Sequence, residues 1–114
     1  MTRLDKCPAS PNCVCSCYPD DTEHFIEPLT FKKNVKSSLK KICLEKFKRC
    51  ELVQEKENYL HFVFTSFLFR FKDDLEFVID SKKKVVHVRS ASRVGHSDLG
   101  VNKKRVEKIR EYLG

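Results

Sequence analysis

The chain has 114 residues and a formal net charge of +7, with 40% hydrophobic residues, 11% aromatic residues and only three glycines and four prolines. This composition excludes a disordered chain and the length excludes two domains, so we expect a single domain over residues 1–114. No stretch approaches the roughly 20 apolar residues of a membrane span, and the N-terminal residues lack the apolar segment of a signal peptide. We therefore expect no membrane span and a cytoplasmic location.

The N-terminal part is predicted to be an irregular arm. Residues 1–23 are rich in Pro, Ser, Asn, Asp and Cys and show no hydrophobic period. Residues 24–31 are compatible with a short strand, which Pro28 confines to a sheet edge. The arm is expected to lie over an α+β core of residues 24–114.

A basic amphipathic helix is predicted next. From Asn34, the expected N-cap, apolar residues recur at three- and four-residue spacing and lysines fill the other face. Residues 31–50 hold seven lysines and one arginine against a single glutamate. Such a face is either an ordinary solvated surface or a patch that binds nucleic acid or an acidic partner weakly. The lysines concerned are Lys36, Lys40, Lys41 and Lys48.

Four strands are predicted after this helix. Residues 50–55 alternate, a turn follows, and residues 59–71 form a long strand whose apolar positions change parity near Thr65 and Ser66. A bulge there would restore one buried face. A loop over residues 72–74 then sets three phenylalanines of this strand against the next strand, all facing the core: Phe67, Phe69 and Phe71.

The last hairpin has a self-consistent register. Centring its turn within residues 81–84 places Phe77 opposite Val88 on the buried face and Glu76 directly opposite Arg89.

A helix over residues 103–113, N-capped by Asn102, ends the chain, and a loop bounded by Gly95 and Gly100 precedes it. A strand meander with one helix before it and one after it belongs to the α+β class. We expect an antiparallel sheet of four to five strands with both helices on one face.

Residues 89–105 gather more polar chemistry than any other segment. Three arginines and several serines surround one strand-to-helix connection, where free backbone N–H groups and the helix dipole favour an anion. Two interpretations stay open: a site for an anionic small ligand, or an internal salt-bridge network. The candidate ligand-binding residues are Arg89, Ser90, Ser92, Arg93, Asp98, Asn102 and Arg105, and the supporting acidic residues are Asp73, Asp74 and Glu76.

The chain contains six cysteines. Without an export signal, thiols are favoured over a disulfide framework. The first four, Cys7, Cys13, Cys15 and Cys17, lack the paired spacing of structural zinc ligands, so we expect no metal. A disulfide between Cys7 and Cys13 is the alternative in an oxidising compartment.

Catalysis has less support than binding. His96 and Asp98 are close in sequence, but no serine or cysteine is placed as a nucleophile, and we predict no catalytic residue and no cofactor. The alternative is a hydrolase-like enzyme in which Asp73, Asp74, Glu76 or His96 does acid–base chemistry.

The basic helix lacks interleaved aromatic residues, so we do not expect nucleic acid as a partner. We expect a monomer.

Four ordered motifs run along almost the entire chain. They are Cys7-Pro8-x-Ser10-Pro11-Asn12-Cys13-Val14, His24-x-Ile26-x-Pro28-Leu29, Phe69-Arg70-Phe71-x-Asp73-Asp74-x-Glu76-Phe77 and Arg89-Ser90-x-Ser92-Arg93-x-Gly95-x-x-Asp98-x-Gly100-x-Asn102-x-x-Arg105-x-Glu107. Together they resemble the family called domain of unknown function 1499. The resemblance implies a small stand-alone domain, often found behind an export or membrane segment, and it implies no activity.

The resemblance makes Cys7 and Cys13 signature positions, as a disulfide or as reactive thiols, because Cys15 and Cys17 lie outside its pattern. It gives the same weight to the arginines of residues 89–105 and to the acidic residues before them. We therefore expect a non-enzymatic binding module that holds a carboxylate or phosphate group at the Arg/Ser-rich loop and the helix N-terminus.

Overall fold

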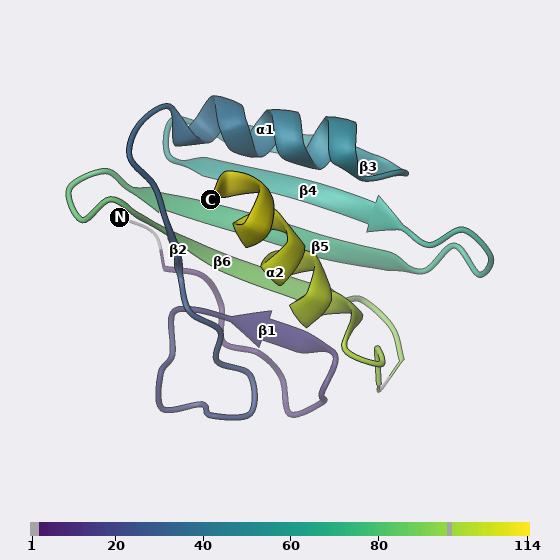
Figure 1. The fold of residues 1–114 in the computed structure, drawn as a ribbon. Coiled ribbons are helices and arrows are strands. Elements are labelled where there is room, and N and C mark those ends of the chain that lie inside the picture. Colours follow the sequence, from purple (N-terminus) through teal and green to yellow (C-terminus); the bar gives the residue numbers. More distant parts are fainter. Residues whose placement is uncertain (1–2, 96) are drawn as a thin grey trace.

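The computed structural model of the chain describes residues 3–95 and 97–114. Its elements, in chain order, are β1 (Cys13–Cys15), β2 (Leu29–Thr30), α1 (Val35–Lys46), β3 (Cys50–Lys56), β4 (Tyr59–Thr65), β5 (Lys72–Asp80), β6 (Val85–Ser92) and α2 (Val101–Leu113). The strands form one six-stranded antiparallel sheet of order β1-β6-β5-β4-β3, with β2 also paired to β6. Both helices cover the same face of it (Figure 1). The predicted α+β class and sheet are confirmed.

The main core lies between the two helices and the sheet. Alternate residues of the three long central strands point to this face, because successive side chains of a strand point to opposite sides. The fully buried members include Leu60, Phe62, Leu75, Phe77, Val86 and Val88 from the sheet and Leu39, Val106 and Ile109 from the helices. Neither described helix is long and apolar enough to cross a bilayer.

The N-terminal arm covers part of the opposite, helix-free face of the sheet. It contains β1, a strand that was not predicted, which places Cys13 opposite Ala91 at the sheet edge. Leu4, Cys7 and Cys15 pack with Val78 and Ala91 in a second apolar cluster. Tyr59 of β4 packs against this cluster at its edge.

The predicted register of the β4–β5 hairpin is wrong. β4 ends at Thr65, and residues 66–71 form the turn, so the parity change marks the end of a strand rather than a bulge. Phe62 lies opposite Leu75 and Leu60 opposite Phe77, which already fills the buried face. The phenylalanines expected in the core are instead 52–70% exposed: Phe67, Phe69 and Phe71.

The β5–β6 register is confirmed, with Phe77 opposite Val88 and Glu76 opposite Arg89. The predicted start of the last helix is wrong, because α2 begins at Val101 and Asn102 is a fully buried residue of its first turn. Asn34 precedes α1 as expected, but its side chain makes no capping hydrogen bond. Asp73 and Asp74, expected in a loop, lie within β5.

Candidate functional site

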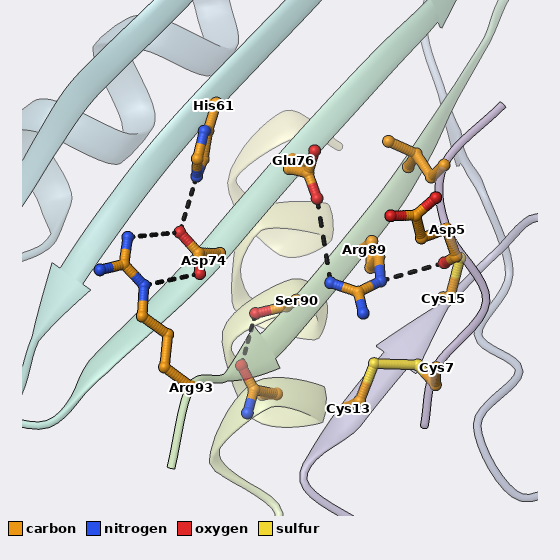
Figure 2. Close-up of polar contacts among 12 residues, drawn as sticks. Asp5, Cys7, Cys13, Cys15, His61, Asp74, Glu76, Arg89, Ser90 and Arg93 are labelled. Atoms are coloured by element: carbon orange, nitrogen blue, oxygen red, sulfur yellow. Dashed lines mark hydrogen bonds and ion pairs between the residues drawn. A yellow bond between two sulfur atoms is a disulfide. The ribbon is translucent and has the colours of Figure 1, made fainter. Parts of the chain in front are cut away.

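The predicted site residues divide between the two faces of the sheet. On β6, Ser90 points towards α2, whereas Arg89, and Arg93 directly after the strand, point to the helix-free face (Figure 2). Arg105 comes from α2 and stays on the helix side, where it contacts Ser90. The three arginines therefore do not converge on one point, although they come from one segment of sequence.

A closed polar network occupies the helix side. Asn102 is its centre: its Oδ1 accepts hydrogen bonds from Ser90 Oγ at 2.6 Å and from Arg105 Nη1 at 2.7 Å. Its Nδ2 donates to Ser92 Oγ at 3.0 Å and to the Asn12 carbonyl at 3.2 Å. Every hydrogen-bonding group of the Asn102 side chain therefore has a partner inside the protein.

Arg105 is the charged member of this network. Its Nη2 donates to Asp73 Oδ2 at 2.8 Å, and the two side chains are only 10% and 13% exposed. The guanidinium carbon also lies 4.3 Å from the centre of the Phe64 ring. An anion from solution would have to displace Asp73 to reach it.

The N-terminus of α2 is occupied by a side chain of the protein. Asp98 accepts hydrogen bonds from the backbone N–H groups of Gly100 at 2.8 Å and Asn102 at 3.1 Å, and from Asn102 Nδ2 at 2.7 Å. Burial alone would raise the pKa of Asp98, but these hydrogen bonds outweigh it and lower the pKa. The anion at this helix end is thus the Asp98 carboxylate.

A second set of polar residues lies on the helix-free face. Arg93 donates to both oxygens of Asp74, from Nε at 2.8 Å and from Nη2 at 2.9 Å, and His61 Nε2 lies 2.7 Å from Asp74 Oδ1 (Figure 2). The hydrogen bonds from Arg93 hold the pKa of Asp74 below its usual value. The Arg93 side chain is still 47% exposed, and neither of its bonds to Asp74 uses Nη1.

Arg89 occupies the same face nearer the arm. Its Nε donates to the Asp5 carbonyl at 3.0 Å, and its Nη1 lies 3.9 Å from Glu76 Oε1. Glu76 also accepts the hydroxyl hydrogen of Tyr59. Burial and this bond both raise the pKa of Tyr59.

A groove of about 860 Å³ runs beside this second set of residues, between the arm and the sheet. Leu4 and Asp5 line one side, and Tyr59, Glu76 and Val78 line the sheet side. On the strands, Tyr59 and Glu76 are two residues from His61 and Asp74, a step of about 7 Å. Arg93 itself does not line the groove, and Tyr59 and Glu76 are the lining residues one strand step from the Asp74–Arg93 pair.

Sequence reasoning did not identify Tyr59 or His61 as site residues. Both contacts are diagonal across β4 and β5, because the register pairs Val63 with Asp74 and His61 with Glu76. The predicted register of this hairpin is wrong, so it did not place Tyr59 and His61 beside Glu76 and Asp74. With the turn placed at residues 66–71, the alternation alone puts both side chains on the helix-free face beside the acidic residues.

Of the two alternatives for Cys7 and Cys13, free thiols or a disulfide, the structure contains the disulfide. Cys7 and Cys13 form a disulfide, with 5.8 Å between their Cα atoms, which closes a loop in the arm. Cys15, Cys17, Cys43 and Cys50 are free. Burial raises the pKa of Cys15 to about 11, so its thiolate is scarce at neutral pH. Among residues 3–95 and 97–114, no group of three or more His, Cys, Asp or Glu side chains is placed to hold a metal.

The remaining candidates are not brought to this surface. Lys36 and Lys40 lie 3.3 Å and 3.1 Å from the Glu55 carboxylate, so part of the lysine face of α1 is bound to β3. Lys41 and Lys48 are exposed. His96 lies outside the described residues.

Comparison with known proteins gives one match. The model of a family described as protein of unknown function (DUF1499) matches residues 3–113. Neither the curated proteins nor the solved structures contain a significant match.

Proposed function

Since the chain belongs to the DUF1499 family, whose description names no activity, we propose from its geometry that it is a non-enzymatic binding module for a small anionic ligand on the helix-free face of the sheet. Arg93 is the residue that carries this proposal. Its guanidinium is held in place by Asp74 and yet is 47% exposed, with Nη1 not used in that pair. A guanidinium that is already immobilised loses little conformational freedom when it binds a carboxylate or phosphate.

The groove gives the ligand a place for its uncharged part. Tyr59 is partly exposed and provides apolar surface there, and a ligand of drug size fits a volume of about 860 Å³. Arg89 and Tyr59 both engage Glu76, which reduces the repulsion between that carboxylate and a passing anion. We therefore place the ligand body in the groove and its anionic group at Arg93.

In this proposal the other predicted ligand-binding residues stabilise the fold and do not contact the ligand. Ser90, Ser92, Asn102 and Arg105 join β6 to α2, and Asp98 occupies the helix end. Their polar atoms face one another, and the bonds among them fix the end of β6, which Arg93 directly follows.

Binding is a better account than hydrolase-like catalysis. The bonds from Arg93 lower the pKa of Asp74, so this carboxylate holds no proton to give as a general acid at neutral pH and is a weaker general base than a free carboxylate. Asp73 is buried against Arg105, and Glu76 is shared between Arg89 and Tyr59. Binding through the lysine face of α1 is also disfavoured, because Glu55 already pairs with Lys36 and Lys40.

Native mass spectrometry of untagged protein from its own cells tests the proposal. We expect a bound mass that is lost on denaturation and is absent from Arg93→Gln, while the control Lys103→Gln, an exposed change on the helix side, keeps it. A bare wild-type protein, or an Arg93→Gln variant that retains the mass, would contradict the proposal.

A further inference from the structure

An exposed apolar tip projects from one end of the sheet. It is the turn between β4 and β5, residues 66–71, which extends beyond the strands at the right of Figure 1. Its large apolar side chains are Phe67, Leu68, Phe69 and Phe71, which are 70%, 72%, 69% and 52% exposed. Soluble monomers rarely expose contiguous apolar side chains without a binding role. We refer to residues 66–71 as the hairpin tip.

The hairpin tip has a defined conformation. Ser66 N–H donates to the Phe71 carbonyl at 2.9 Å, and Phe71 N–H donates to Ser66 Oγ at 2.8 Å. The rings of Phe69 and Phe71 stack with 5.5 Å between their centres. These contacts close the turn on itself and leave the aromatic side chains on its outside.

Basic residues surround the base of the tip. The guanidinium of Arg49 lies over the Phe67 ring, 5.3 Å from its centre, and Lys72 Nζ donates to Thr65 Oγ1. Arg70 belongs to the tip itself and is exposed. Asp73 and Asp74, the acidic residues of β5 at this end, each pair with an arginine. Glu51 on β3 is exposed and is outnumbered there by Arg49, Arg70 and Lys72.

A smaller apolar group lies at the same end of the sheet. Val94, Leu99 and Val101, in and beside the β6–α2 connection, are 52%, 84% and 45% exposed. The hydrogen bond from Arg93 N–H to the Lys72 carbonyl joins the end of β6 to the start of β5, which places this connection beside the tip. Figure 1 shows both loops at the right-hand end.

We infer that the hairpin tip docks on an anionic lipid bilayer. Phenylalanine and leucine side chains at the apex enter the boundary of the acyl chains, and Arg49, Arg70 and Lys72 meet the negatively charged headgroups. The tip matches the layers of a bilayer, because its apolar apex would meet the hydrocarbon and the basic residues at its base would meet the charged headgroups. A projecting apex suits this soft surface, whereas a protein partner would need a matching pocket. The inference does not rest on the proposed ligand site.

Tryptophan fluorescence provides the test, because the chain contains no tryptophan. Phe69→Trp places a single reporter in the tip, and Tyr112→Trp, a 40% exposed position in the last turn of α2, is the matched control. We expect a blue shift of the Phe69→Trp emission with vesicles of phosphatidylcholine containing about 30% phosphatidylserine. The control emission should not move, and neutral vesicles should produce little shift.

Vesicle sedimentation measures the affinity of the untagged chain. Phe67→Ser combined with Phe69→Ser should weaken binding at least about tenfold, because the variant has two fewer phenyl rings to transfer from water into the bilayer. Arg70→Gln combined with Lys72→Gln should weaken it and reduce its salt dependence. An unmoved Phe69→Trp emission, or binding that survives loss of both rings, would overturn the inference. A blue shift that follows protein concentration without vesicles would overturn it in favour of contact between two copies.

Discussion

The Asp98 carboxylate accepts hydrogen bonds from both the backbone N–H and the side-chain Nδ2 of Asn102, at 3.1 Å and 2.7 Å. One aspartate thereby fills the helix end that the sequence predicts to be an anion site. Asn102, which the sequence predicts to be the cap, is instead the buried link between α2, β6 and the arm. The polar residues at this helix end stabilise the fold.

Removal of the Asn102 side chain should therefore destabilise the protein. Asn102→Ala removes one hydrogen-bond partner each from Ser90, Arg105 and the Asn12 carbonyl in a buried site, so we expect a loss of about 2–3 kcal/mol in the free energy of unfolding. Urea denaturation measures it. Lys103→Ala, an exposed neighbour, should change stability by less than about 0.5 kcal/mol. Equal effects of the two variants would contradict the role of Asn102.

The corrected hairpin register makes a second prediction. Phe62 is fully buried, so Phe62→Ala should cost about 3–5 kcal/mol of stability. Phe67 is 70% exposed, and Phe67→Ala should alter stability by no more than about 0.5 kcal/mol. Thermal or urea unfolding of the two variants compares the positions, and a large loss for Phe67→Ala would support the register that the structure rejects.

The disulfide of the arm should make a measurable contribution. Cys7 and Cys13 are six residues apart, and closing so short a loop in the unfolded chain stabilises by about 2 kcal/mol in the chain-entropy account. We expect the Cys7→Ser/Cys13→Ser variant to lose this amount. Thiol titration of the denatured wild-type protein should find the four free cysteines. Six reactive thiols without reductant would contradict the pairing.

His24 should make stability depend on pH. Its Nδ1 lies 2.8 Å from Asp21 Oδ2 and its Nε2 lies 2.8 Å from the Ser10 carbonyl. Burial alone would lower the pKa of His24, but these acceptors outweigh it and raise the pKa. The stabilisation is then complete below the unfolded value of about 6.5 and is lost as the pH rises through the folded pKa.

We accordingly expect a smaller free energy of unfolding at about pH 8.5 than at about pH 6, measured by urea denaturation. Asp21→Asn should reduce the difference, since it removes the charge that favours the imidazolium. A difference of unchanged size in Asp21→Asn would assign the pH dependence to another group.

The sequence predicted the elements that follow a clear period and missed those that depend on distant contacts. The helix at Val35–Lys46 and the Glu76–Arg89 pairing are confirmed, because local periodicity and a short turn determine them. The strand within the arm was missed because Cys13–Cys15 exists only by pairing with β6.

The residues predicted to form one site lie on two faces of the sheet, and the sequence did not show this for a related reason. The arginines at positions 89 and 93 are separated from Ser90 by strand parity, which the sequence shows, but Arg105 can be assigned to a face only once α2 is packed. The capping role of Asp98 likewise depends on the turn that Gly100 allows by its left-handed backbone, with φ of 79°.

The most direct test of the ligand site is an NMR titration that follows the arginine side-chain N–H resonances with inorganic phosphate and with citrate as probes. The account predicts a saturable shift of the Arg93 Nε–H resonance and none of Arg105, whose guanidinium is enclosed by Asp73, Ser90 and Asn102. Arg93→Gln should leave the fold intact and abolish the saturable response. A response at Arg105 or at the Gly100 amide, with Arg93 unmoved, would place the anion at the helix end and contradict the account.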